Sequence, residues 1–313
     1  MSNSRPKVST APHLALIAVQ VMFATWPIVG KIALRTMPSV GLVAVRVAGA
    51  SLAFILIGGI RGRLEKIRKE DWPVLIASSL LGVVLNQWLF VKGLSLTTVI
   101  NATLLGTTIP IFTLLVSIIL RTDRASLRRI MGIALAAAGV VYLIGPARSD
   151  FSAVTRFGDL LIVANSLCYG AYIAISKDLA TRYGALTVIT WLFIIGCIVT
   201  LPVGAISLSP ISLTTVSMRV WLAILYIILV PTVGAYYLNG WALARVPPST
   251  VAVYIYLQPL IAFSLAPLLF SEKLNWRTLI ASLLVFAGVV IVTRRGRSQA
   301  IQKVAQHPEA FGH

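Results

Sequence analysis

The segment YIYLQPLIAFSLAP, residues 254–267, is almost wholly apolar, yet Gln258 and Pro259 stand together inside it. A proline removes a backbone N–H donor and breaks a helix in water. A bilayer lets such a helix persist, because neighbouring helices or cavity water satisfy the freed carbonyl groups. The segment therefore predicts a membrane-spanning helix with a kink, where Gln258 faces either a neighbouring helix or a ligand.

Composition extends this prediction to the whole chain. Of 313 residues, 58% are hydrophobic and only 12% are charged, with a mean hydropathy of +0.91. About a quarter of an average soluble chain is charged. Ten apolar runs have roughly the length that crosses a hydrocarbon core of ~30 Å. These runs are 12–30, 40–60, 73–91, 98–120, 129–145, 159–176, 187–207, 219–239, 249–270 and 277–293.

Lysine and arginine are distributed unevenly between alternate predicted loops. One set, which includes both tails, carries 18 of these residues, and the opposite set carries 8. Cytoplasmic loops of membrane proteins hold the excess of positive charge. The pattern predicts cytoplasmic tails at 1–10 and 294–313, and it accounts for the net charge of +18 without a nucleic-acid partner.

Neither the cysteines nor the first apolar run indicates secretion. Cys168 and Cys197 both fall inside predicted spans, so we expect no disulfide. The first run contains Trp26 and Pro27, and no clear small-residue cleavage site follows it. We therefore expect a retained first helix and not a signal peptide.

Comparison of the chain with itself reveals a repeat. With a shift of 149 residues, Pro110 aligns with Pro259, and AAGVVYL (137–143) aligns with FAGVVIV (286–292). Apolar runs and loops stay in phase over this region. The sequence predicts two five-helix units. Their bounds are 11–145 and 158–293.

An odd number of spans in each unit predicts that the two units cross the membrane in opposite senses. The expected fold is an all-α membrane protein of ten transmembrane helices, arranged as two inverted five-helix repeats. Inverted repeats are typical of secondary carriers, which bind substrate near the midplane between the halves. Pro110 and Pro259 are candidate hinges in this arrangement, with a role in packing as the alternative.

At this point the residues resemble a known family. FATWPIVGKIALR (23–35), followed by Arg46, and LNQWLFVKGLSLTTVINATLLGTTIPIFTLL (85–115) are similar to the early helices of EamA-type carriers, within the drug/metabolite transporter superfamily. The turns Asp123–Arg124 and Glu272–Lys273 at equivalent places of the two units strengthen the resemblance, although Glu is more usual where Asp123 stands. The resemblance implies export or facilitated movement of amino acids or other small metabolites.

Acidic residues are scarce where a proton pump needs them. None of the nine Asp and Glu residues lies in the middle of a predicted span, and Asp159 and Asp178 fall at the ends of the sixth. His13, His307 and His313 lie in the tails or at the edge of the first span. Intramembrane enzymes and proton carriers use such groups within the bilayer. We therefore expect no catalytic residue, no metal, no cofactor, and a facilitator or exchanger.

Arg46, unlike the acidic residues, lies well inside a predicted span. It is six residues into its helix and roughly 9 Å from the outer end. Lys31 and Lys92 end the first and third helices on the same side. Together the three cations predict a basic outer vestibule that attracts a carboxylate. The alternatives are interfacial anchoring for Lys31 and Lys92, and hydrogen bonding to neighbouring helices for Arg46.

Polar and aromatic side chains at helical spacing predict the wall of a substrate cavity. Interhelical hydrogen bonds are the alternative for the amides, and interfacial positions are the alternative for aromatic residues near helix ends. The candidate substrate-binding residues are Gln20, Pro27, Lys31, Arg46, Asn86, Gln87, Asn101, Asn165, Tyr169, Tyr172, Tyr237, Trp241, Tyr254 and Gln258.

The sequence thus favours a secondary transporter of a small organic metabolite, an amino acid or a related compound, that works by alternating access in a bacterial inner membrane. One alternative is an antiporter of nucleotide sugars or sugar phosphates, which needs more cations at mid-depth. Another is a membrane protein that transports nothing. Small residues of the fifth and tenth helices, such as Gly139 and Gly288, predict close packing and offer a face for a homodimer.

Overall fold

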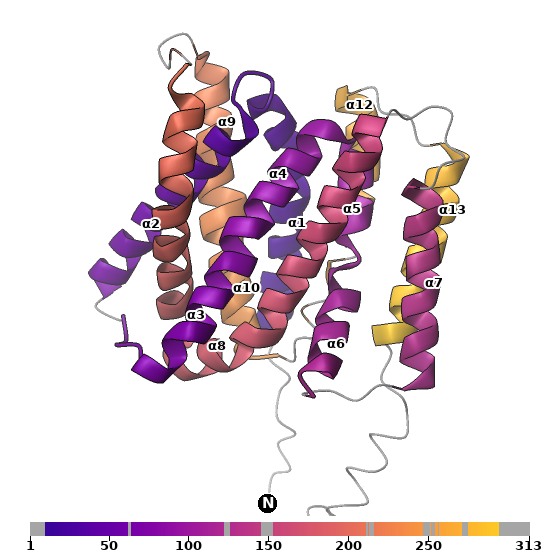
Figure 1. Ribbon diagram of the computed structural model, residues 1–313, viewed down its shortest axis with the longest axis horizontal. Helices are drawn as coiled ribbons and strands as arrows, with labels where there is room; N and C mark the ends of the chain where they lie inside the picture. The colour runs from indigo at the N-terminus through magenta and orange to yellow at the C-terminus, as the bar shows by residue number, and fades with distance from the viewer. Residues whose placement is uncertain are drawn as a thin grey trace, which may run out of the picture.

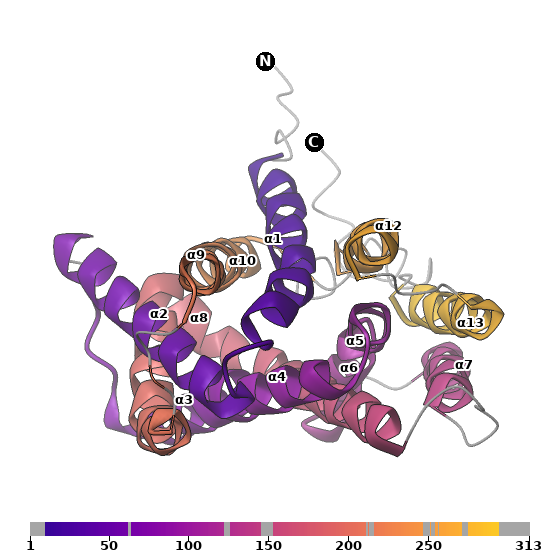
Figure 2. The same cartoon turned by 90° about the horizontal axis from the view of Figure 1, so that it is seen from above.

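The computed structural model describes residues 10–61, 64–121, 126–144, 153–210, 212, 216–246, 251, 254–255, 257–270 and 275–293. In these ranges the regular structure is helical throughout. The turns Asp123–Arg124 and Glu272–Lys273 and both predicted tails, apart from Thr10, lie outside the described residues. Figure 1 shows the helices running roughly side by side, and Figure 2 shows the same bundle from above.

The helices follow the apolar runs of the sequence. In chain order they are α1 (Ala11–Ala33), α2 (Ser39–Arg61), η1 (Lys69–Asp71), α3 (Trp72–Ser79), η2 (Leu80–Leu85), α4 (Asn86–Leu96), α5 (Val99–Gly106), α6 (Ile109–Ile119), α7 (Leu127–Ile144), α8 (Ala153–Leu208), α9 (Met218–Ile228), η4 (Leu229–Gly234), α10 (Ala235–Leu243), α12 (Leu257–Phe270) and α13 (Trp276–Thr293).

Six helical stretches within the described residues are long and apolar enough to cross a membrane. The longest, α8, comprises two helices that meet at a kink at Gly184, whose φ of 74° and ψ of 153° are not helical. Glycine adopts a positive φ without a steric penalty. Shorter apolar helices occur at 130–143, 257–269 and 276–288.

The predicted span 98–120 is not one continuous helix. It consists of α5 and α6, which are separated by Thr107 and Thr108. Pro110 lies in the first turn of α6, where its missing N–H disturbs no helical hydrogen bond. Pro259 is likewise in the first turn of α12, and it is buried. Both candidate hinge prolines therefore begin a helical segment.

Two π-helical turns, η2 and η4, were not predicted from the sequence. Every residue of η4 lies 149 positions after its counterpart in η2, which is the shift that aligns the two halves of the sequence. A π-helical turn inserts one residue into a helix and often occurs at functional sites. The equivalent irregularities fall in the third and eighth predicted spans.

Helices α7 and α13 pack against each other at one edge of the bundle (Figure 2). Their glycines make this contact close. A Cβ on Gly288 would lie 2.5 Å from the carbonyl oxygen of Gly132, and one on Gly139 would lie 2.9 Å from Leu284 Cβ. The predicted close packing of small residues thus occurs within the chain, and the homodimer stays a prediction.

Candidate functional site

A cavity lies between α1, α2, α4, α5, α6, α8, α10 and the start of α12. It contains about 770 Å³ of empty space, part of which is open to the surroundings. The wall consists of Gln20, Phe23, Trp26, Pro27, Arg46, Asn86, Gln87, Phe90, Ala102, Thr103, Gly106, Ile109, Asn165, Tyr169, Ile173, Tyr236, Asn239, Val251, Ile255 and Gln258.

Arg46 is a buried cation in this wall, with only 1% of its surface exposed. Its Nε donates to Thr232 Oγ1 at 2.6 Å, and its Nη1 donates to Gln87 Oε1. The guanidinium carbon lies 4.2 Å from the centre of the Trp26 ring, which is cation–π distance. These three partners are neutral. Among the described residues no carboxylate forms an ion pair with Arg46.

The π-helical turn η4 provides one of these partners. Thr232 lies in η4, and its hydroxyl donates to the carbonyl of Ile227, five residues earlier, at 2.7 Å. The same oxygen accepts from Arg46 Nε. The irregular backbone thus holds the threonine oxygen in the orientation that the guanidinium needs.

Gln87 extends the network from Arg46 to the other half of the chain. Its Nε2 donates to the hydroxyl of Tyr236 at 3.0 Å. Tyr236 follows Gln87 by 149 residues, so the two are equivalent positions of the sequence repeat. The contact places a residue of the first half directly against its own counterpart.

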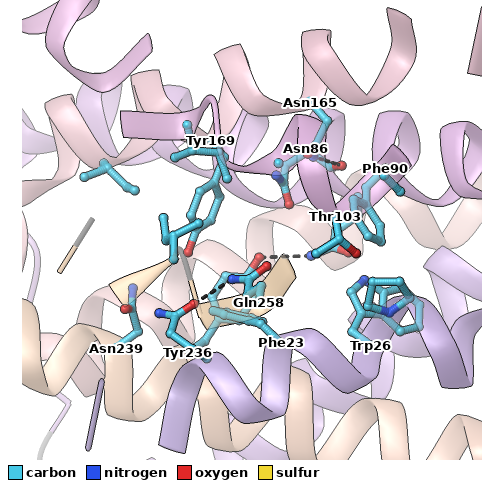
Figure 3. A pocket seen from close by; sticks show the side chains of 18 of the residues that line it. Phe23, Trp26, Asn86, Phe90, Thr103, Asn165, Tyr169, Tyr236, Asn239 and Gln258 are labelled. Atoms are coloured by element: carbon cyan, nitrogen blue, oxygen red, sulfur yellow. Dashed lines mark hydrogen bonds between the residues drawn. The ribbon is translucent and has the colours of Figure 1, made fainter. Parts of the chain in front are cut away.

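Aromatic rings lie at several places around the cavity (Figure 3). Trp26 and Phe90 are stacked, with ring centres 5.8 Å apart and planes inclined by 26°. Phe23 meets the edge of Tyr236 at 5.9 Å, and Tyr169 meets the same ring at 6.4 Å. Of these rings, Trp26 offers its flat surface directly to the Arg46 guanidinium.

Amide side chains provide most of the remaining polarity. Gln258 Nε2 donates to Gln20 Oε1 at 2.6 Å, which joins α12 to α1, and Asn165 Nδ2 donates to the carbonyl of Asn86 at 2.8 Å (Figure 3). Asn239 also lies in the wall. No aspartate or glutamate of the described chain belongs to it. The described residues contain no cluster of His, Cys, Asp or Glu suited to a metal ion.

The candidate residues from the sequence divide into two groups. Eight lie in the cavity wall, namely Gln20, Pro27, Arg46, Asn86, Gln87, Asn165, Tyr169 and Gln258. The other six, Lys31, Asn101, Tyr172, Tyr237, Trp241 and Tyr254, lie outside it.

The three cations of the predicted vestibule are not gathered in the cavity. Lys31 Nζ donates to the carbonyl of Thr97 at 2.5 Å, and Lys92 is exposed. Of the three, only Arg46 lines the wall. On α1 the candidates Gln20 and Pro27 lie in the wall, together with Phe23 and Trp26, and Lys31 does not.

The two carboxylates that the sequence places at the ends of the sixth span have different environments. Asp159 is 0% exposed, whereas Asp178 is exposed. Thr97 Oγ1 donates to Asp159 Oδ1, and Asn101 Nδ2 lies 3.1 Å from each carboxylate oxygen. Helix α8 begins at Ala153, earlier than predicted, and Asp159 is buried because it faces Thr97 and Asn101 where α4 ends and α5 begins. Asn101 therefore holds this carboxylate and does not face the cavity.

The remaining candidates outside the wall have other contacts. Tyr172 packs over η2, where a Cβ on Gly82 would lie 2.5 Å from its ring. Tyr254 OH lies 2.8 Å from His13 Nδ1 at the start of α1. Trp241 stacks under the guanidinium of Arg245 at 4.0 Å, and Tyr237 is half-buried.

Sequence reasoning missed several wall residues, chiefly Phe23, Trp26, Phe90, Thr103, Tyr236 and Asn239. Four of these are aromatic and stand among many apolar neighbours, so neither periodicity nor composition separates them from lipid-facing residues. A signal did exist for Tyr236, because the repeat shift of 149 residues aligns it with the predicted wall residue Gln87.

Comparisons with known proteins agree with this architecture. The sequence profile of the EamA-like transporter family matches residues 10–145 and again 156–294. An uncharacterized transporter of Archaeoglobus fulgidus is 28% identical over 92% of this chain and 99% of its own length. A probable terminal-alkyne amino-acid exporter of Streptantibioticus cattleyicolor is 25% identical over 92% of this chain and 95% of its own.

A crystal structure of another protein shares the fold, with a TM-score of 0.63 at 20% sequence identity over 91% of this chain and 98% of that one. Together with the apolar helices, these matches identify an integral membrane protein.

Proposed function

We propose, from the premise that the chain belongs to the EamA-like transporter family, that it is a secondary transporter of a small organic metabolite. The proposed substrate is an amino acid or a related compound, and the mechanism is alternating access. The observation that carries this proposal is the cavity, whose wall combines Arg46, aromatic rings and neutral amides from both halves of the chain.

Three features support the finer proposal of ten spans in two inverted repeats. The π-helical turns η2 and η4 recur with the repeat shift, and Pro110 and Pro259 both begin a helical segment. Gln87 contacts its own counterpart Tyr236. In a pair of units related by a twofold axis, a residue can touch its counterpart only near that axis. The cavity would then lie at the axis, where inverted-repeat carriers bind their substrates.

The charge distribution supports cytoplasmic tails, and we place the protein in a bacterial inner membrane. An antiporter of sugar phosphates or nucleotide sugars is less well supported, because its phosphates would need several cations. Arg46 is the single lysine or arginine in the cavity wall formed by the described residues.

Counterflow in proteoliposomes tests the proposal. Purified protein is reconstituted, the vesicles are loaded with one unlabelled compound of an amino-acid panel, and uptake of the same labelled compound is measured after dilution. Transient accumulation above that of empty liposomes is the expected result. A panel that includes nucleosides, sugars and sugar phosphates, and that gives no accumulation with any compound, would contradict a transport function.

A further inference from the structure

Building on the proposed function, we infer that the cavity selects the carboxylate of its substrate and takes no part in recognising an amino group. The substrate class is an organic monocarboxylate with a flat apolar body, with or without an amine. This inference goes beyond an amino-acid carrier, because an acid without an amine is then as good a ligand as an amino acid.

The first step is the charge of Arg46. A guanidinium remains protonated in proteins and offers five N–H donors. The described contacts use two of these, to Thr232 Oγ1 and Gln87 Oε1, and both acceptors are neutral. A buried cation in a membrane span is costly unless water or an anion accompanies it. The cavity that Arg46 borders is the place where such an anion can enter.

The second step is the absence of negative charge in the same wall. None of the described wall residues is acidic. The buried carboxylate of Asp159 is not part of the wall, and it already accepts from Thr97 and Asn101. An ammonium group against these side chains would therefore find only neutral oxygens and the repulsion of Arg46. A carboxylate would find a planar cation that can bind it with two parallel hydrogen bonds.

The third step places the apolar part of the ligand. Trp26 contacts the Arg46 guanidinium and also stacks with Phe90. A ligand whose carboxylate lies on Arg46 therefore has aromatic surface immediately beside it. Flat rings gain from offset stacking on such surfaces. The arrangement fits a molecule in which one carboxylate is separated from a ring by a short linker.

Three compounds with the same phenyl group and a two-carbon linker isolate the charged group. They are 3-phenylpropionate, phenylalanine and phenethylamine, which carry a carboxylate alone, a carboxylate with an amine, and an amine alone. Equilibrium binding of each labelled compound to the purified full chain is measured in detergent at neutral pH. We expect the two carboxylates to bind within about tenfold of each other and phenethylamine to bind about a hundredfold more weakly.

Variants of Arg46 and Thr232 separate recognition from a purely structural role of the arginine. Arg46→Gln should abolish the preference for the carboxylates, whereas Arg46→Lys should retain part of it. Thr232→Val removes one neutral partner of the guanidinium and leaves the charge in place. The ratio of the binding affinities for 3-phenylpropionate and phenethylamine should stay unchanged in this variant even if its melting temperature falls. If Arg46→Gln does not yield folded protein, the ratio of carboxylate to amine affinity in the unmodified chain and in Arg46→Lys still tests the inference.

The outcomes are distinct. Equal binding of phenethylamine and 3-phenylpropionate would overturn the inference, as would an unchanged preference in folded Arg46→Gln. If none of the three compounds binds, the counterflow panel decides. Exchange of compounds that lack a carboxylate would refute the carboxylate inference and leave the transport function standing. No exchange of any compound would refute the transport function itself.

Discussion

The helices are joined by different chemistry at the two ends of the bundle. At one end, α8 meets the junction of α4 and α5 through the buried carboxylate of Asp159, which accepts from Thr97 and Asn101. At the other end, α1 meets the segment before α12 through a contact between the His13 ring and the Tyr254 hydroxyl. Lys31 and His13 lie at opposite ends of α1, and Lys31 bonds to Thr97, so the two contacts lie at opposite ends of the bundle.

Backbone packing also differs between the Asp159 end and the His13 end of the bundle. Beside Asp159, a Cβ on Gly158 would lie 3.0 Å from the carbonyl oxygen of Gly93, so α4 and α8 approach very closely. Near His13 the additional link is the hydrogen bond between Gln258 and Gln20. Hydrogen bonds to charged groups contribute about 1.5–3 kcal/mol, and those between neutral groups about 0.5–1.5 kcal/mol. We therefore expect the Asp159 end to be closed more firmly than the His13 end in this conformation.

Removal of the Asp159 carboxylate should have the largest effect on this difference. In Asp159→Ala the donors of Thr97 and Asn101 lose their buried acceptor, which should cost about 3 kcal/mol and loosen the Asp159 end. The melting temperature of the purified protein in detergent should fall clearly. Asp178→Ala, an exposed position of the same helix, is the matched control, and an equal fall in both variants would contradict the prediction.

Separation of the two close backbones should have the next largest effect. In Gly158→Ala the new methyl group must displace α4, and overpacking of this kind costs about 1–3 kcal/mol. Gly59→Ala serves as the control, because a Cβ at Gly59 would meet no atom within 4 Å. Thermal unfolding of both variants measures the difference. If Gly158→Ala proved as stable as Gly59→Ala, the close approach would contribute nothing to the closure.

Loss of the contact between His13 and Tyr254 at the opposite end should cost less. Tyr254→Phe removes the hydroxyl group that lies against His13 and should cost about 1 kcal/mol. A lightly closed end should open more readily in this variant. In a protein without Cys168 and Cys197, a cysteine introduced at the wall position Asn239 should be labelled faster when Tyr254→Phe is present. Unchanged labelling would mean that the contact between His13 and Tyr254 does not limit opening.

The smallest effect should come from the exposed ion pair between Arg182 and Asp71. Arg182 Nη1 donates to both carboxylate oxygens at 2.8 and 2.6 Å, but the Arg182 side chain is 49% exposed. Exposed ion pairs contribute little because water and salt screen them. Arg182→Gln should leave the melting temperature nearly unchanged. A fall as large as that of Asp159→Ala would show that exposure is a poor guide to which contacts hold this bundle together.

The prediction of the candidate site was strongest where a polar residue stands alone among apolar ones. Gln20, Arg46, Asn165 and Gln258 all lie in the cavity wall. The prediction was weakest for aromatic residues and for residues near helix ends. Trp26 and Phe90 look like ordinary apolar residues in the sequence, and their pairing depends on how α1 packs against α4.

The sequence by itself determined the apolar helices, the uneven distribution of positive charge and the repeat of 149 residues, because hydrophobic length and periodicity are local properties of the chain. Only the tertiary structure decided the environments of the two buried charges. Arg46 and its partner Thr232 are 186 residues apart, and Asp159 and Thr97 are 62 apart. Contacts over such separations depend on the order and rotation of packed helices, which no single segment encodes. This packing leaves Arg46 beside the cavity and encloses Asp159 between helices.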